Sequence, residues 1–373
     1  MIQINDILKS KIESRIRRYD NKNFEAIQDI LNDCCADLQI DTPTLIYCDT
    51  LAKSFSTFNL RGSSYLIYDN CLMEALHIFN SIVVYKNDIH DIDKLFYKLF
   101  AEELLIQGDL AHSLYFTGKY GQLTFTFQNT KTGYESMLSH QITYQIYFLI
   151  GHELTHLALE TMSGWGISND FFMIVQSATR LLAERFVEDG MSINEVLSRF
   201  SGYFVDEKTQ NIDEYINLLT TSDRFSHFVE ECYCDFTGIK LLLENYVAPD
   251  ESISAITNVL NFLIILESIK SNLIMGIKDI NLTNKEAKDT LYFSVLRVQL
   301  LLIILQISDT MEIKIPRSGI KDCGFITERL KTFIQSLPSE NSMRTIDDNI
   351  LKSIKKTDII SYITKKLYYC YIN

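Results

Sequence analysis

QITYQIYFLIGHELTHLALE, residues 141–160, is the stretch that decides the fold. Apolar side chains surround its central turns on every face, and a helix of that kind belongs in a protein interior. His152, Glu153 and His156 nevertheless stand within it, in the pattern HExxH. Burying three ionisable side chains is costly unless they are paired or bind a cation. The stretch therefore predicts a central buried helix that carries a divalent metal ion.

The spacing of this motif suits such an ion. Residues four apart lie above one another on one face of a helix, so His152 and His156 can offer imidazole nitrogens to the same ion. Glu153 then faces the adjoining space, where it could act as general base on a water molecule. The alternative is two core histidines beside a buried glutamate, which the apolar surroundings disfavour.

A second helix is predicted over residues 223–246, DRFSHFVEECYCDFTGIKLLLENY. His227, Glu231 and Asp235 follow one another on it at i,i+4 steps, and two carboxylates so placed repel each other unless they share a positive charge. We expect Glu231 to be the third metal ligand and Asp235 to orient a ligand histidine by accepting its free ring N–H. Gly238 would let this helix approach its neighbour closely.

Other assignments of these residues stay open. The acidic residues could form a face exposed to water, and His227 could replace Glu231 as the ligand or donate to the transition state. Glu160 is an unfavourable third ligand because it lies far from His152 along the helix. His227, Arg224 and Tyr203 are candidates for the second donor that stabilises an oxyanion.

Composition bounds the class of protein. The chain has 373 residues, 47% of them hydrophobic, so a folded protein with a large core is expected. Its formal net charge is -13, and Lys and Arg form no cluster larger than pairs, which argues against nucleic acid as the main partner.

Cysteine usage and hydropathy bear on the compartment. The 8 cysteines follow no framework spacing, and residues 1–16 lack the apolar core of a signal peptide, so we expect reduced thiols in a cytoplasmic protein. Two apolar stretches, 255–277 and 291–307, are interrupted by charged or amide side chains. They are therefore expected to be core helices, without membrane insertion.

The pattern along the chain predicts an α+β fold that is predominantly helical. Residues 2–37 have helical periodicity. Short β-branched or aromatic runs at 44–49, 54–59 and 64–70 predict a small antiparallel sheet packed on the HExxH helix, and the alternating run 121–129 predicts a fourth strand or hairpin arm.

Two of these motifs together resemble a known family. HELTH at 152–156 followed by EECYCDFTG at 230–238 resembles the zincin metallopeptidases of the gluzincin type, in which a later helix supplies a Glu within E-x-x-x-D. The strands SFSTFN and SYLIYDN with the helix after them are similar to the compact sheet of the minigluzincins and of the heat-shock and CAAX-processing membrane proteases. A weaker analogy is to cytoplasmic peptidases of phage exclusion.

This resemblance implies one zinc ion per chain, held by His152, His156 and Glu231, with Glu153 as base. The chain departs from the thermolysin-like enzymes in its longer interval between His156 and Glu231, and it lacks the metzincin continuation HExxHxxGxxH. The implied parts are a helical N-terminal cap (1–40), a zincin-like domain (41–250) with helical insertions at about 83–120 and 165–220, and an all-helical C-terminal region (251–373).

The function expected from these residues is that of a zinc-dependent endopeptidase, which hydrolyses peptide bonds through a zinc-activated water with Glu153 as general base. Its partner would be a protein or peptide substrate, cleaved with narrow specificity inside the cell, and the oligomeric state stays open. Strand 64–70 would be the sheet edge on which an extended substrate pairs. The alternatives are a non-catalytic helical interaction protein with a structural or vestigial metal site, and a hydrolase acting on something other than a peptide.

Overall fold

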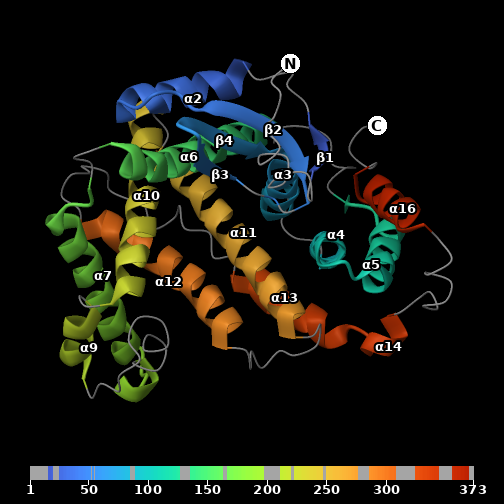
Figure 1. Cartoon of the computed structure of the whole chain (residues 1–373). Coiled ribbons are helices and arrows are strands. Elements are labelled where there is room, and N and C mark those ends of the chain that lie inside the picture. The colour runs from blue at the N-terminus through green and yellow to red at the C-terminus, as the bar shows by residue number, and fades with distance from the viewer. Residues whose placement is uncertain are drawn as a thin grey trace.

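A computed structural model of the chain describes residues 16–19, 25–51, 53, 55–84, 89–126, 135–162, 166–196, 211–219, 222–246, 249–275, 285–307, 324–343 and 355–368. The fold is α+β and predominantly helical, as predicted, with one small sheet (Figure 1).

The sheet has four strands in the order β1-β2-β4-β3. They are β1 (Ile16–Tyr19), β2 (Thr44–Thr50), β3 (Ser56–Leu60) and β4 (Ser63–Asp69). The three predicted strands are thus confirmed as β2, β3 and β4. The prediction of a wholly antiparallel sheet is wrong, because the β3–β4 hairpin joins the sheet with β4 beside β2, so that these two strands run parallel.

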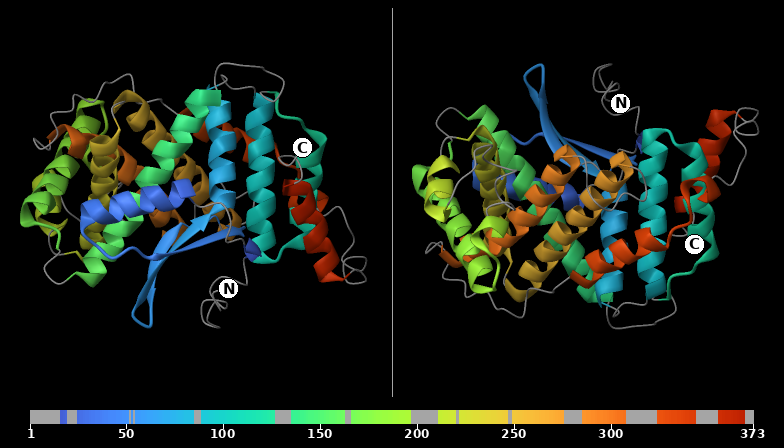
Figure 2. Two further views of the ribbon diagram at one scale, coloured as in Figure 1. Left: turned by 90° about the horizontal axis from the view of Figure 1, so that it is seen from above. Right: turned by 90° about the horizontal axis from the view of Figure 1, so that it is seen from below.

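The β3–β4 hairpin turns at Arg61 and Gly62. Both residues have positive φ, 53° and 80°, and two successive residues of that kind form the tight turn whose twist matches the strands on either side. The hairpin reaches out from the helical body in Figure 2. Because β4 lies between β2 and β3, the prediction that strand 64–70 is the sheet edge is wrong, and β3 occupies that edge.

The N-terminal region is less helical than predicted. Residues 16–19 form β1, which pairs antiparallel with β2, whereas residues 25–38 form the expected helix, α2 (Glu25–Leu38). Residues 1–15 and 20–24 lie outside the described part of the chain. The strand predicted at 121–129 is absent from its described portion, where α5 ends at Gln122, and residues 127–129 are not described.

The other regular elements of the described chain are helices. The first five after the sheet are α3 (Asn70–Val84), α4 (Ile89–Gln107), α5 (Leu110–Gln122), α6 (Glu135–Thr161) and α7 (Asn169–Glu188). The HExxH motif lies in α6. Those that follow are α9 (Ile212–Leu219), α10 (Asp223–Asn245), α11 (Pro249–Met275), α12 (Lys285–Ile307), α13 (Gly324–Ser336), α14 (Glu340–Met343) and α16 (Lys356–Tyr368). The division of the chain at residues 40 and 250 stays a prediction.

Two apolar clusters form the core. The larger one gathers side chains of the sheet, α3, α4, α6 and α11, and the smaller one lies among α7, α9 and the first half of α10. α6 is as deeply buried as its sequence predicts: Tyr147, Phe148, Ile150 and Leu154 are at most 1% exposed. α10 and α12 contribute to both clusters, so the place where α10 crosses α6 lies between the two.

One described helix is apolar and long enough to cross a membrane, Asp250–Leu273 within α11. Within the protein, 83% of its most apolar window is buried, which is the burial of a core helix.

Candidate metal centre

α6 and α10 approach each other closely at two glycines. A Cβ atom on Gly238 would lie 2.9 Å from the carbonyl oxygen of Phe148, and one on Gly151 would lie 3.1 Å from the Cα of Gly238. Any larger residue at Gly238 would therefore press on the backbone of α6. The role predicted for Gly238 is confirmed, and the close contact brings the carboxylates of α10 within reach of the imidazoles of α6.

Three of these side chains form a group that could hold a metal ion. One ligand atom each from His152, His156 and Glu231 lies within 4.8 Å of the other two. His156 Nε2 is 3.3 Å from Glu231 Oε1, and His152 Nε2 is 3.7 Å from Glu231 Oε2. His152 is buried and the other two are half-buried. The three residues expected as ligands are therefore brought together from α6, which ends at Thr161, and α10, which begins at Asp223.

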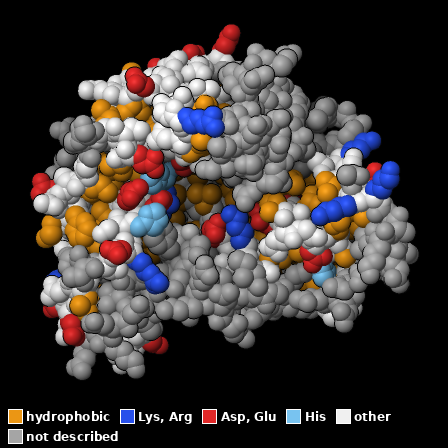
Figure 3. Space-filling view, viewed as in Figure 1, with side chains coloured by type: hydrophobic (Ala, Val, Ile, Leu, Met, Phe, Trp, Pro, Cys, Tyr) orange, Lys and Arg blue, Asp and Glu red, His pale blue; other side chains and the backbone are white. Residues whose placement is uncertain are grey.

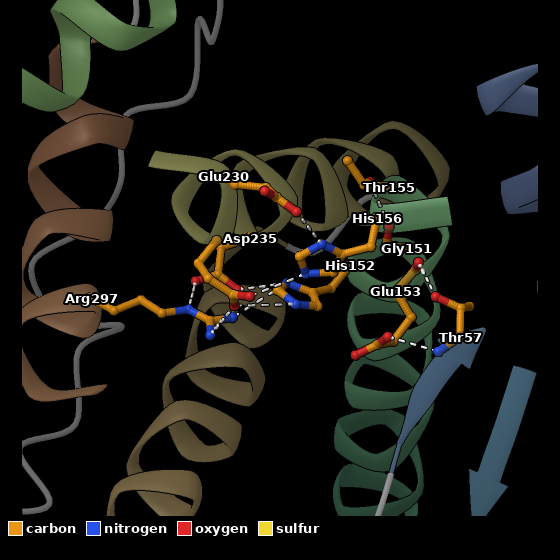
Figure 4. Close-up of polar contacts among 10 residues, drawn as sticks. Thr57, Gly151, His152, Glu153, Thr155, His156, Glu230, Asp235 and Arg297 are labelled. Carbon is orange, nitrogen blue, oxygen red and sulfur yellow. Dashed lines mark hydrogen bonds and ion pairs between the residues drawn. The ribbon is translucent and has the colours of Figure 1, made fainter. Parts of the chain in front are cut away.

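The opposite ring nitrogens of both histidines lie against carboxylates. His152 Nδ1 is 3.0 Å from Asp235 Oδ1, and His156 Nδ1 is 3.0 Å from Glu230 Oε1 (Figure 4). A proton on each Nδ1 can be donated to these acceptors, so both Nε2 atoms face Glu231 and can offer a lone pair there to a metal ion in place of a proton. Asp235 thus lies where an orienting acceptor was expected. Glu230, next to Glu231 in the chain, is a second such acceptor that sequence reasoning missed.

Arg297 of α12 is the other residue that sequence reasoning missed. Its Nε and Nη2 donate to the two oxygens of Asp235, at 2.5 and 2.6 Å, and its Nη1 donates to Glu231 Oε2 at 2.6 Å. Asp235 is fully buried, so this bidentate pair supplies the positive charge that its carboxylate needs. In the sequence, Arg297 is a single arginine in an apolar run, a pattern that by itself argues only against a membrane span.

The charges of the group shift its pKa values. Burial raises the pKa of Glu231, but its contacts with His156 and Arg297 outweigh burial and hold that pKa well below its usual range. Burial lowers the pKa of His156, yet the hydrogen bond and charge of Glu231, with Glu153 and Glu230, raise it to about 9. A cation is therefore favoured at this place, as a proton on His156 or as a metal ion.

Glu153 lies beside the group and is fixed by the edge strand. The backbone N–H of Thr57 in β3 donates to Glu153 Oε2 at 3.0 Å, and Thr57 Oγ1 donates to the Glu153 carbonyl oxygen at 3.0 Å. Burial raises the pKa of the Glu153 carboxyl, against the opposing effect of His152. A carboxylate with a raised pKa is a better proton acceptor, as a general base requires.

The group faces a cleft of about 390 Å³. Polar and charged residues, those of the group among them, line one part, and five apolar side chains line another: Phe55, Leu72, Phe148, Leu149 and Leu263. In the space-filling view, histidine and carboxylate side chains gather beside a hollow with apolar side chains in it (Figure 3). The candidate ligands are thus accessible from outside the protein.

The remaining candidates lie apart from this group. Among the described residues, the cluster of possible ligands contains neither His227 nor Glu160. His227 is exposed on α10, one turn before Glu231, and Arg224 is also exposed. Glu160 lines the cleft and accepts a hydrogen bond from Asn59 Nδ2 at 3.1 Å. Tyr203 lies outside the described residues.

Comparison with known proteins gives the chain no family. Neither the protein-family models nor the curated proteins nor the solved structures contain a match to it.

Proposed function

We propose that the protein is a zinc-dependent peptidase whose metal ligands are His152, His156 and Glu231 and whose general base is Glu153. Three features found together at one place support the proposal: a His-His-Glu group that could hold a metal ion, the half-buried Glu153 beside it, and a cleft onto which both open. Two imidazoles and a carboxylate are the ligand set of many catalytic zinc sites.

The ligand set fits zinc in chemistry and in spacing. Imidazole nitrogens and a carboxylate oxygen are ligands of zinc, and side chains that lie within 4.8 Å of one another can meet at a single ion. When bound, the ion would polarise a substrate carbonyl and lower the pKa of water. Asp235 and Glu230 would keep the imidazole rings turned with Nε2 toward the ion.

The residues around the ion would move the protons. Glu153 would accept a proton from the attacking water and then donate it to the leaving amide nitrogen. Its contacts with Thr57 hold the carboxylate at the cleft, and its raised pKa makes it a better acceptor of the proton from the water. The positive charge of Arg297, which also lines the cleft, would favour the oxyanion that forms on the carbonyl oxygen.

A peptide is the substrate class that the cleft best supports. Residues 55 and 57, at the edge strand β3, line it, and an extended peptide could follow that edge. The apolar part of the cleft would take up a side chain of the substrate, because burying apolar surface is favourable. Cleavage inside the cell, with narrow specificity, is part of this proposal.

The opposing interpretation is a helical interaction protein with a structural metal. A structural zinc is enclosed by four protein ligands, whereas a catalytic zinc keeps one position open. Among the described residues the group contributes three ligands, and it opens onto the cleft. These two features favour the catalytic interpretation.

The test compares wild type with Glu153→Gln on a proteome-derived peptide library, with new N-termini identified by mass spectrometry after zinc loading. We expect cleavage by the wild type, at least about 100-fold less by Glu153→Gln, and equal zinc content in both. Glu244→Gln, which makes the same change at an exposed position of α10, should cleave as the wild type does. Full activity of Glu153→Gln would refute the mechanism.

A further inference from the structure

The described side chains of α12, residues 294–307, include a single charge. Arg297 interrupts the run SVLRVQLLLIILQI, and the helix otherwise packs into both apolar clusters of the core. Its side chain is 16% exposed. Burial of a guanidinium is costly unless carboxylates compensate for the lost hydration. The position of this charge therefore needs a reason beyond the packing of α12.

The guanidinium spans two carboxylates that stand one turn apart on α10. It forms a bidentate pair with Asp235 through Nε and Nη2, and at the same time reaches Glu231 Oε2 through Nη1. Two carboxylates at i,i+4 on a helix repel each other, and within the protein this repulsion is stronger than in water. Arg297 removes that repulsion before any metal ion is bound.

The contact leaves the other oxygen of Glu231 available. Oε1 remains 3.3 Å from His156 Nε2, on the side of the two imidazoles. A metal ion can therefore enter among His152, His156 and Glu231 while Arg297 keeps its hold on Oε2 and Asp235. The ion and the guanidinium would then share the Glu231 carboxylate, while the guanidinium also neutralises Asp235.

We propose that Arg297 is a resident counter-ion that keeps the metal-free protein folded, and that it does so at a cost in metal affinity. This inference rests on the metal site of the proposed function. Two cations close to the same carboxylates repel each other, so each stabilises the protein more when the other is absent. The repulsion between the metal ion and the guanidinium, a few ångströms apart in a partly buried site, is larger than the free energy of the one hydrogen bond that Arg297 donates to Glu231. Removal of the Arg297 charge should therefore make the protein depend on metal.

The experiment measures the melting temperature with chelator and with zinc, for wild type, Arg297→Gln and Arg297→Lys. We expect Arg297→Gln to melt lower without metal and to gain more from zinc than the wild type does, by about 3 °C or more. Arg297→Lys keeps a charge but lacks the fork that reaches both carboxylates, so its gain should lie between the two.

A matched control is available in Arg329, which forms a bidentate pair with Asp93 between α13 and α4, away from the metal group. Arg329→Gln should lower the melting temperature with and without zinc by the same amount, because its pair does not share a carboxylate with the metal.

Each outcome decides the matter. Folding of Arg297→Gln only in the presence of zinc would support the inference in its strongest form. A zinc-dependent gain of the Arg297 variants equal to that of the wild type, or failure of both to fold even with zinc, would overturn it and leave the proposed function intact. The absence of any zinc-dependent gain in the wild type would overturn the proposed metal site as well.

Discussion

Replacement of Gly238 by alanine tests how the centre is built. The new Cβ would lie 2.9 Å from the carbonyl oxygen of Phe148 and 3.1 Å from the backbone nitrogen of His152. An ordinary contact between carbon and oxygen is about 3.3–3.6 Å, so α6 and α10 must separate by roughly 0.4–0.7 Å. Backbone atoms on both sides of the contact leave no flexible side chain to absorb the change.

Two opposing terms set the size of the effect. Alanine in place of glycine within a helix stabilises it by about 1 kcal/mol, whereas overpacking costs about 1–3 kcal/mol. The free energy of unfolding of Gly238→Ala should therefore stay level or fall by up to about 2 kcal/mol. Gly118→Ala is the control, since Gly118 is helical, exposed and has no atom within 4 Å of an added Cβ. It should gain about 1 kcal/mol.

The assay is urea unfolding of both variants in chelator, followed by zinc titration against a competing chelator. Because metal sites tolerate ligand displacements of only about 0.2 Å, Gly238→Ala should also bind zinc about tenfold more weakly, whereas Gly118→Ala should bind as the wild type does. A Gly238→Ala protein as stabilised as Gly118→Ala, with unchanged zinc affinity, would refute the close approach of α6 and α10.

Three further predictions concern buried charges and protonation. Burial raises the pKa of Glu102, but the charges of Lys53 and Lys98 outweigh burial and lower that pKa to about 2, below its value of 4.5 in the unfolded chain. The free energy of unfolding should therefore fall as the pH falls from about 5 to 2. In Glu102→Gln this loss of stability should be smaller, as urea midpoints measured across the same pH range would show. Lys53→Met should cost about 3–5 kcal/mol, since the Lys53 Nζ lies 2.9 Å from the buried Glu102 Oε2, and a loss below 1 kcal/mol would contradict the buried pair. Zinc binding at pH 7 should release about one proton, because the pKa of His156 is about 9 without metal. Titration calorimetry in two buffers of different ionisation enthalpy measures the number of protons released. Equal heats of binding in the two buffers would exclude this proton release.

Features that depend on neighbours in the sequence could be predicted. The apolar surroundings of HELTH indicated a buried helix, and the i,i+4 spacing of Glu231 and Asp235 indicated one face of a second helix. Helical periodicity fixes which side chains share a face, so the sequence indicated that His152 and His156 could meet at one ion. It left Glu231 and His227 as alternatives for the third ligand, and the structure groups Glu231 with the two histidines. The glycine at 238 indicated the contact between the two helices.

Features that depend on distant pairing could not be predicted. The parallel pair of β2 and β4 arises from where the hairpin joins the sheet, and no local pattern distinguishes that from an antiparallel meander. Helical periodicity over residues 2–37 concealed β1, whose partner is more than 25 residues away. Arg297 reaches Asp235 across 62 residues, and a single arginine in an apolar helix does not name its partner.

Elemental analysis of the purified protein measures whether His152, His156 and Glu231 hold a zinc ion. Wild type, Glu231→Ala and His227→Ala are compared, after circular dichroism has shown that all three are folded. We predict about one zinc per chain in the wild type, its loss in Glu231→Ala, and its retention in His227→Ala, where an exposed histidine of the same helix is removed. A wild-type protein that holds no metal even after zinc is supplied would contradict the account.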